Sequence, residues 1–110
     1  MNRYCVSGRL GKDPELRTSQ NNENWLLFSL AVTTGQDETT WLLCKAFGRS
    51  AELIADHFRS GYGLELEGHF RTEVWQTDFG PEDKLVLYVD RMSFCPTSSA
   101  QMKAALARAE

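Results

Sequence analysis

The chain has 110 residues, a length typical of one domain, and its 42% hydrophobic and 25% charged residues are ordinary for a globular protein. The formal net charge of −3 argues against a protein that simply coats itself with nucleic acid, because such domains are often strongly basic. The charge is uneven. Residues 1–50 carry six Lys and Arg against five Asp and Glu, whereas residues 51–90 carry three against nine. Any basic surface is therefore expected in the first half.

The sequence carries no signal for secretion or membrane insertion. The first residues lack the apolar run of a signal peptide, and no apolar stretch approaches the roughly 18 residues of a membrane span. Cys5, Cys44 and Cys95 are odd in number and form no Cys-x-x-Cys pair, so neither a disulfide framework nor a zinc site is indicated. We expect a cytoplasmic protein with reduced thiols, no membrane partner, no metal and no cofactor.

The first half of the chain alternates between apolar and polar residues, the pattern of β-strands. Turn residues at 12–15 and polar stretches at 19–24 and 34–39 separate the apolar segments. In the segment after residue 24, the even-numbered residues from Leu26 to Val32 make one core face. The predicted strands are residues 4–10, a short segment at 16–18, residues 25–33 and residues 40–49.

The predicted strand over residues 40–49 has two different faces, because successive side chains of a strand point to opposite sides. Every second residue from Leu42 to Ala46 is small or apolar and suits a core. The alternate face carries Trp41, Lys45 and Phe47, and Arg49 follows it. Aromatic rings alternating with cations suit a surface that stacks bases and neutralises phosphates. The alternative is that both aromatic rings are simply core residues.

The second half begins with one predicted helix over residues 50–59, where apolar residues recur at helical spacing and Gly61 follows as a left-handed cap. Residues 64–76 alternate strictly and predict a strand. Its even-numbered apolar residues, as far as Val74, are expected to face the core. Gly68 in the middle of this strand marks a bend or a close approach of another backbone.

The order of the elements indicates the fold class. Residues 77–83 are predicted as a hairpin tip, residues 84–94 as the last strand and residues 97–110 as a short helical tail. Three strands, one helix and two strands favour a small barrel over an open sheet. We predict an all-β domain with one internal helix over residues 1–96, an OB-fold with a five-stranded Greek-key barrel, followed by the tail.

Four linked stretches resemble the bacterial single-stranded DNA-binding protein (SSB) family, in order and at the family's spacing. They are GRLGKDPELR at residues 8–17, FSLAV at 28–32, TWLLCKAFGRSAE at 40–52, and the stretch from Gly61 through LEGHFRT at 66–72 to Trp75. The resemblance covers about residues 4–94. It implies an OB-fold that binds single-stranded DNA without sequence preference, commonly as a homotetramer, in DNA replication, recombination and repair.

The resemblance also implies which residues bind DNA. Three aromatic residues fall where the family carries base-stacking rings, and each stacked base is worth roughly 1–3 kcal/mol. The cations nearest the motifs are expected to contact phosphates, so affinity should fall with salt. The predicted single-stranded DNA-binding residues are Trp41, Phe47, Trp75, Arg9, Lys12, Arg17, Lys45, Arg49 and Arg71.

The chain departs from the family pattern in three places. The loop over residues 34–39 is short and holds no aromatic residue, and Glu73 and Val74 stand where a basic pair is common. The chain ends without the long linker and acidic, aromatic-tipped tail by which relatives recruit replication and repair enzymes. We expect weaker or more salt-sensitive DNA binding than in a typical relative, and no recruitment through such a tail.

Two hypotheses follow. The first is a non-catalytic single-stranded DNA-binding protein that forms a homo-oligomer, either a tetramer or a dimer. The alternative is an oligomerising OB-fold accessory module of a replication-restart or plasmid system, with weak DNA affinity, which acts through protein contacts. The acidic second half and Glu73 motivate this alternative. An enzyme such as a nuclease is disfavoured, because no carboxylate cluster or His/Cys constellation has the spacing of a metal site or an activated nucleophile.

Overall fold

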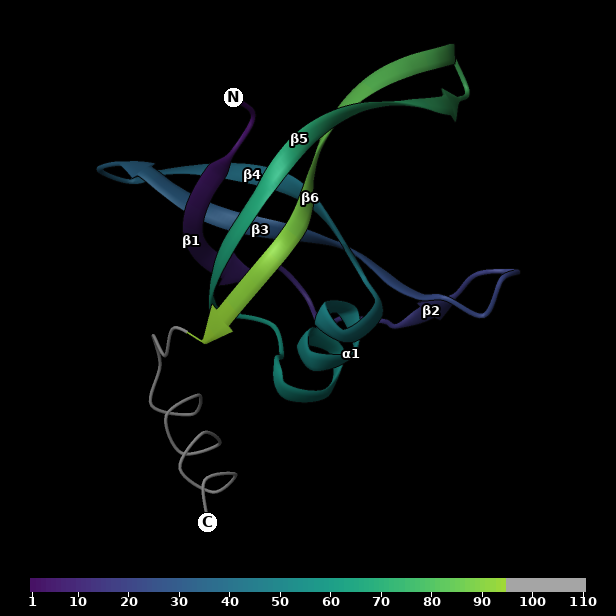
Figure 1. Ribbon diagram of the computed structural model, residues 1–110. Coiled ribbons are helices and arrows are strands. Elements are labelled where there is room, and N and C mark those ends of the chain that lie inside the picture. Colours follow the sequence, from purple (N-terminus) through teal and green to yellow (C-terminus); the bar gives the residue numbers. More distant parts are fainter. Residues whose placement is uncertain (95–110) are drawn as a thin grey trace.

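A computed structural model describes residues 1–94 and shows a closed barrel of five strands, with one helix beside one end of the barrel (Figure 1). A sixth, very short strand adds to the outside of the barrel. The elements are β1 (Tyr4–Leu10), β2 (Arg17–Thr18), β3 (Asn24–Gly35), β4 (Glu38–Phe47), α1 (Gly48–His57), β5 (Gly63–Thr77) and β6 (Gly80–Phe94).

The strand order β1-β5-β6-β4-β3 is closed by a further pairing of β1 with β3. All of these pairs are antiparallel except β4 with β6, a short parallel pair in which Cys44 lies opposite Leu87 and Lys45 opposite Tyr88. The short strand β2 pairs with β3. A five-stranded barrel with one helix between its third and fourth strands is the OB-fold, which confirms the fold class predicted from the sequence.

In β3 and β4 the core is made by the residues that alternation assigned to it. The even-numbered residues of β3 and β4 point inward, and α1 adds Ala51 and Ile54 from the end of the barrel that it covers. This burial of apolar surface is the main term that stabilises the barrel. The buried core includes Leu10, Leu26, Phe28, Leu30, Cys44, Ala46, Ile54, Phe58, Leu64 and Leu66.

At Gly68 the backbones of β5 and β6 come close together. The register of the two strands shifts between Glu67 and Gly68, as a β-bulge requires. A Cβ atom on Gly68 would lie 2.1 Å from the backbone oxygen of Tyr88, so no other residue fits without moving a strand. The predicted close backbone approach is therefore confirmed. Past this point β5 and β6 leave the barrel together as a long arm (Figure 1).

The arm corrects two sequence predictions. The hairpin tip is not residues 77–83: β5 continues to Thr77 and β6 starts at Gly80, so two residues form the turn. Gly80 has φ +105° and supplies the conformation that the turn needs, which lets the polar residues after it join the strand. Val74 is 63% exposed rather than part of the core, because the arm extends beyond the barrel that would have covered it.

The helix also differs at its ends. It begins at Gly48, two residues before the predicted start, and ends at His57. Its C-cap is Phe58, which has an extended backbone and donates its N–H to the Ile54 carbonyl. Gly61 has φ +84° but lies after the helix, in the turn that leads to β5. The predicted tail over residues 97–110, and Cys95, lie outside the described residues.

Candidate nucleic-acid interface

The outward side of the β3–β4 hairpin, called here the outer face, carries an aromatic side chain near each end of β4. Trp41 is 60% exposed and Phe47 is 37% exposed, so neither ring is a core residue. Five residues of β4 lie between them, so the two residues are six positions apart, a distance of about 20 Å along a strand. From one end of the outer face to the other, the cross-strand pairs are Trp25–Phe47, Leu27–Lys45, Ser29–Leu43 and Ala31–Trp41.

At the Phe47 end of the outer face, one carboxylate accepts hydrogen bonds from three side chains. Glu73, from the arm, accepts hydrogen bonds at 2.9 Å on both oxygens from Lys45 Nζ. Its Oε1 atom accepts a third bond, 2.8 Å long, from Trp75 Nε1, and its Oε2 atom accepts one from the Tyr88 hydroxyl. We call Lys45, Glu73, Trp75 and Tyr88 the Glu73 cluster. It ties β4 to both strands of the arm.

The Glu73 cluster keeps its carboxylate ionised. Burial by itself would raise the pKa of Glu73, but hydrogen bonds from Tyr88, Trp75 and Lys45, together with the Lys45 charge, outweigh burial and lower the pKa to about 2. The same contact raises the pKa of the Tyr88 hydroxyl, because the hydroxyl proton is held by Glu73 and the group is partly buried. At neutral pH the Glu73 carboxylate therefore stays negatively charged beside Lys45.

Aromatic rings and cations extend this end of the surface. The Tyr88 ring lies 5.7 Å from the Phe47 ring and 5.7 Å from the His69 ring, centroid to centroid. The Arg71 guanidinium carbon lies 4.9 Å from the centre of the Tyr88 ring. These distances are within the range of aromatic and cation–π contacts. The rings of three different strands thus form one continuous patch.

Trp25 is flanked by two cations. The guanidinium carbon of Arg17, on β2, and Lys45 Nζ each lie 5.5 Å from the centre of the Trp25 ring. Because Trp25 stands opposite Phe47 across the hairpin, it joins the aromatic patch to the strand β2. A cation held over a ring keeps its charge, so Arg17 remains able to contact an anion that approaches from solvent, whereas Lys45 is already bound by Glu73.

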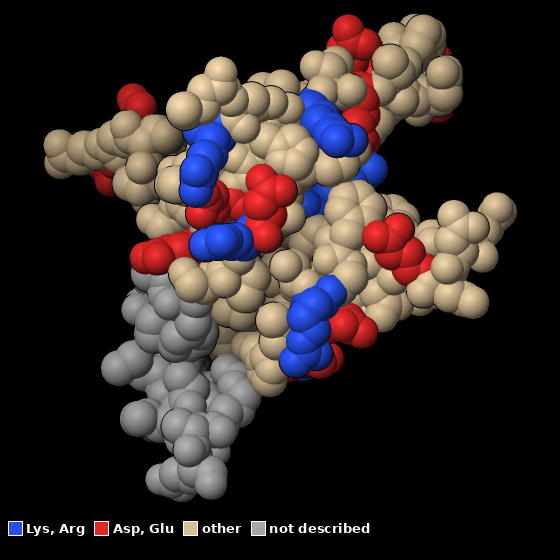
Figure 2. All heavy atoms as spheres, in the orientation of Figure 1, with Lys and Arg blue, Asp and Glu red and all other residues tan. Residues whose placement is uncertain are grey.

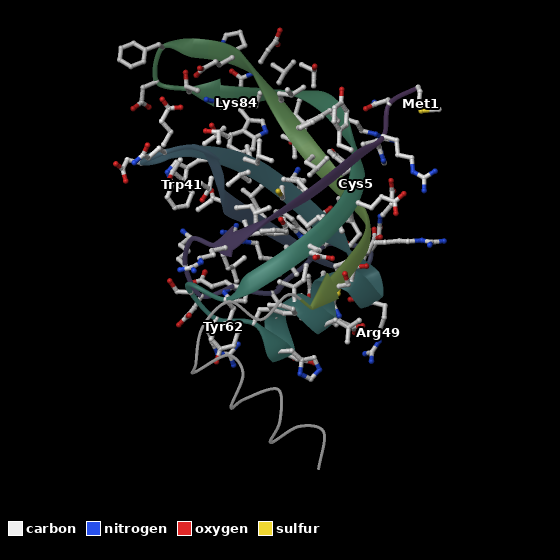
Figure 3. The ribbon with its side chains drawn as sticks, turned by 90° about the vertical axis from the view of Figure 1, so that its left-hand side faces the viewer. Met1, Cys5, Trp41, Arg49, Tyr62 and Lys84 are labelled. Atoms are coloured by element: carbon white, nitrogen blue, oxygen red, sulfur yellow. The ribbon has the colours of Figure 1, made fainter. Side chains whose placement is uncertain are left out.

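The Trp41 end of the outer face is built differently. Arg9 on β1 pairs with Ala31 on β3, and Ala31 pairs with Trp41, so the three residues form one row across the sheet. The Trp41 ring also lies close to Gly11, where a Cβ atom would come within 2.7 Å of Trp41 Cζ3. Figure 3 shows Trp41 at the side of the barrel, below the arm that carries Lys84.

A groove of about 120 Å³ runs between the two ends, where the connection from β1 to β2 crosses the outer face. Two cations line it, and so do two carboxylates, which limits its positive potential. The lining residues are Lys12, Asp13, Pro14, Glu15, Arg17, Leu27, Phe28, Ser29 and Leu43.

The structure places Arg49 on the helix, far from Trp41. Arg49 lies on α1, where its Nη1 atom is 4.0 Å from Glu52 Oε2, and Figure 3 shows it on the opposite side of the barrel from Trp41. The opposite charges are also mixed elsewhere. Figure 2 shows Lys and Arg side chains next to Asp and Glu over β1, β5 and β6, where Arg3 pairs with Glu67.

Comparison with known proteins agrees with the fold and the motifs. Residues 1–95 match the single-strand binding protein family. The chain belongs to this family. It is 29% identical over 102 residues to the single-stranded DNA-binding protein of Fusobacterium nucleatum subsp. nucleatum. The aligned residues cover 86% of this chain and 66% of the relative.

Two further bacterial relatives of this SSB-family chain carry the same name. The single-stranded DNA-binding protein of Clostridium perfringens is 36% identical over 83 residues, which cover 73% of this chain and 55% of the relative. The single-stranded DNA-binding protein of Chlamydia pneumoniae is 29% identical over 94 residues, which cover 82% of this chain and 59% of the relative. The chain thus spans between half and two thirds of the length of these relatives.

Two residues of the SSB-family chain join the surface although the sequence did not assign them to it. Trp25 lies outside the family motifs, and Tyr88 comes from the last strand. Alternation in the last strand separates Tyr88 from Leu87, but it does not identify an outward ring, because Val86 shares the parity of Tyr88 and is buried whereas Leu85 shares that of Leu87 and is exposed. The pairing of β6 with β4, which sets Tyr88 beside Lys45, has no local signal in the sequence.

Two further observations apply to the part of the chain that the structure describes. Within residues 1–94, no group of three or more His, Cys, Asp or Glu side chains is placed to hold a metal ion. In the same range, no helix is long and apolar enough to cross a membrane.

Proposed function

We propose that this SSB-family protein binds single-stranded DNA without sequence preference, by stacking bases on aromatic rings and neutralising phosphates. The observation that carries the proposal is the exposed aromatic surface of β3, β4 and the β5–β6 arm. This is the region through which OB-folds bind oligonucleotides, and stacking on rings tolerates any base because every base has a π face. The names of the bacterial relatives support the same ligand.

The proposed contacts divide by chemistry. Trp41, Phe47 and Trp75 are the stacking residues, and Tyr88 extends the patch between the last two. The cations beside these rings are the proposed phosphate ligands, namely Arg9, Lys12, Arg17 and Arg71. Lys45 is bound by Glu73 and Arg49 lies on α1, so their contribution to phosphate binding remains a prediction.

We further propose that the protein works without catalysis, as a cytoplasmic homo-oligomer in replication, recombination or repair. The family membership supports this role. We also propose that residues 1–96 form one DNA-binding domain, which agrees with the extent of the family match. A nuclease activity would show itself as loss of the bound strand when magnesium is added.

The test is a titration of the intrinsic tryptophan fluorescence with a thymidine oligomer at several salt concentrations. We expect quenching, because bases stack on Trp41 and Trp75, and an observed affinity that falls linearly with salt on logarithmic axes. The slope, divided by about 0.7, gives the number of phosphate contacts. Absence of quenching and of binding at low salt would overturn the proposal. A stable oligomer without affinity for single strands would instead favour the accessory-module alternative.

A further inference from the structure

The cation at the centre of the aromatic surface is already bound by an anion of the protein. Both oxygens of Glu73 lie 2.9 Å from Lys45 Nζ, and the two side chains are only 15% and 19% exposed. An exposed ion pair is weak and is easily exchanged for solvent. This one is shielded and held by two further hydrogen bonds, from Trp75 and Tyr88, so Lys45 is not a free phosphate ligand.

The carboxylate of Glu73 has the chemistry of the group it would compete with. A carboxylate and a phosphate both present negatively charged oxygens that accept charge-assisted hydrogen bonds at similar distances. A phosphate that approached Lys45 would meet Glu73 first, and two anions a few ångströms apart repel each other. Because the pKa of Glu73 is about 2, protonation does not remove this repulsion at neutral pH.

The other partners of Glu73 indicate what its position provides. Trp75 Nε1 and the Tyr88 hydroxyl both point at the carboxylate, which fixes the orientation of two rings of the aromatic patch. Tyr88 in turn contacts the Phe47 ring. The same carboxylate therefore holds the rings for stacking and removes one cation from phosphate binding.

We propose that Glu73 is an internal substitute for a DNA phosphate: it occupies the phosphate position of Lys45, positions Trp75 and Tyr88, and so shifts DNA binding from phosphate contacts toward base stacking. This inference rests on the proposed binding of single-stranded DNA. Its consequence is a surface whose affinity depends less on salt than its number of cations suggests.

The test compares Glu73→Gln with Glu67→Gln in a salt-series titration with a thymidine oligomer. Glu67 is the matched control, because it is also a β5 glutamate paired with a cation, Arg3, but lies where β5 pairs with β1, six positions before Glu73. Both variants remove one negative charge. For Glu73→Gln we expect a salt slope steeper by about 0.7, the value of one added phosphate contact. We also expect roughly tenfold tighter binding at low salt, the value of one hydrogen bond to a charged group.

Between about 50 and about 200 mM salt, one added contact changes the ratio of the Glu73→Gln and wild-type affinities about 2.6-fold. An unchanged slope for Glu73→Gln, or the same increase in Glu67→Gln, would refute the inference while leaving the proposed function intact. Absence of binding by the wild type would instead refute the proposed function itself.

Lys45→Met gives a second test that does not require Glu73→Gln to fold. If Glu73 already occupies Lys45, removing the lysine leaves the wild-type salt slope unchanged. A slope shallower by about 0.7 would show that Lys45 contacts phosphate in the wild type, and would contradict the inference. In the double variant, Lys45→Met should abolish the gain produced by Glu73→Gln, as expected for two groups that act on each other.

Discussion

Replacing Trp41 by alanine tests whether the outer face stacks bases. The Trp41 side chain is 60% exposed, at the end of β4 that is farthest from the Glu73 cluster. If one base stacks on this ring, the substitution should weaken binding of a thymidine oligomer by roughly 1–3 kcal/mol, or about five- to 150-fold in Kd. Trp41→Phe keeps a smaller ring and should lose less.

The cost of the same substitution to the fold is bounded by burial. A tryptophan buries up to about 250 Å², and the 40% of the Trp41 side chain that is covered, partly by Gly11, then corresponds to about 100 Å². At about 25 cal/mol per Å², Trp41→Ala should lower the free energy of unfolding by at most about 2.5 kcal/mol. The variant should therefore still fold if the wild type has ordinary stability.

The assay is the fluorescence anisotropy of a labelled thymidine oligomer, because removing Trp41 alters the intrinsic fluorescence. Leu85→Ala is the matched control: Leu85 is also 60% exposed but lies on the opposite side of the arm from Trp75 and has no π face. Thermal unfolding and sedimentation should accompany the titrations, so that loss of the fold or of the oligomer is recognised. Equal affinities of Trp41→Ala and the wild type, or an equal loss in Leu85→Ala, would refute stacking on this ring.

Three further predictions concern stability and reactivity. The pKa of Glu73 is lowered from 4.5 to about 2, so its ionisation contributes roughly 3 kcal/mol to the free energy of unfolding. This contribution is complete above about pH 5 and is lost as the pH falls toward about 2. Denaturation at neutral and acidic pH should therefore show a smaller pH dependence of stability for Glu73→Gln than for the wild type. Gly68→Ala should lower the free energy of unfolding by about 2 kcal/mol or more, because the added Cβ would lie 2.1 Å from a backbone oxygen. Gly35→Ala is the control: its added Cβ would meet the flexible side chain of Glu38, whose carboxylate lies 3.0 Å away, so the free energy of unfolding should change little in the same denaturation experiment. A thiol reagent at mildly alkaline pH should label the exposed Cys5 in the folded protein but should label Cys44 only after unfolding, because burial raises the pKa of the Cys44 thiol to about 12. Peptide mass mapping distinguishes the two labelled cysteines. Labelling of Cys44 before unfolding would contradict its burial.

Local periodicity was enough to separate the two faces of the strand at residues 40–49. Alternation placed Cys44 and Ala46 on the small, apolar face and Trp41 and Phe47 on the other, and the family motifs then favoured the outside for the two rings; the burial of the four residues agrees. A strand has a side-chain period of two whatever it pairs with, so this information is present within a few residues. The close backbone approach at Gly68 was readable for a similar reason, since a glycine within an alternating strand is itself a local signal.

The same periodicity failed where a face is exposed by the shape of the whole molecule. Val74 continues the inward alternation of β5, yet it is 63% exposed because the arm runs past the end of the barrel. The turn was also misjudged, since the positive φ of Gly80 allows the acidic residues that follow to pair as a strand. Neither the length of the arm nor its distance from the core is encoded in a short window of sequence.

The candidate site also contains features that local sequence patterns predict and features that depend on contacts between distant strands. From the sequence, alternation separated the two faces of the strand at residues 40–49, the family motifs favoured an outward position for its aromatic rings, and the order of elements predicted an OB-fold. Each of these signals lies within short stretches of the chain or in their order. The contact of Lys45 with Glu73, which follows it by 28 residues, and the position of Tyr88 beside them are visible only in the folded chain. Closure of the barrel pairs β6 with β4 and brings these side chains together. Contacts between distant strands depend on that closure, which no local pattern specifies.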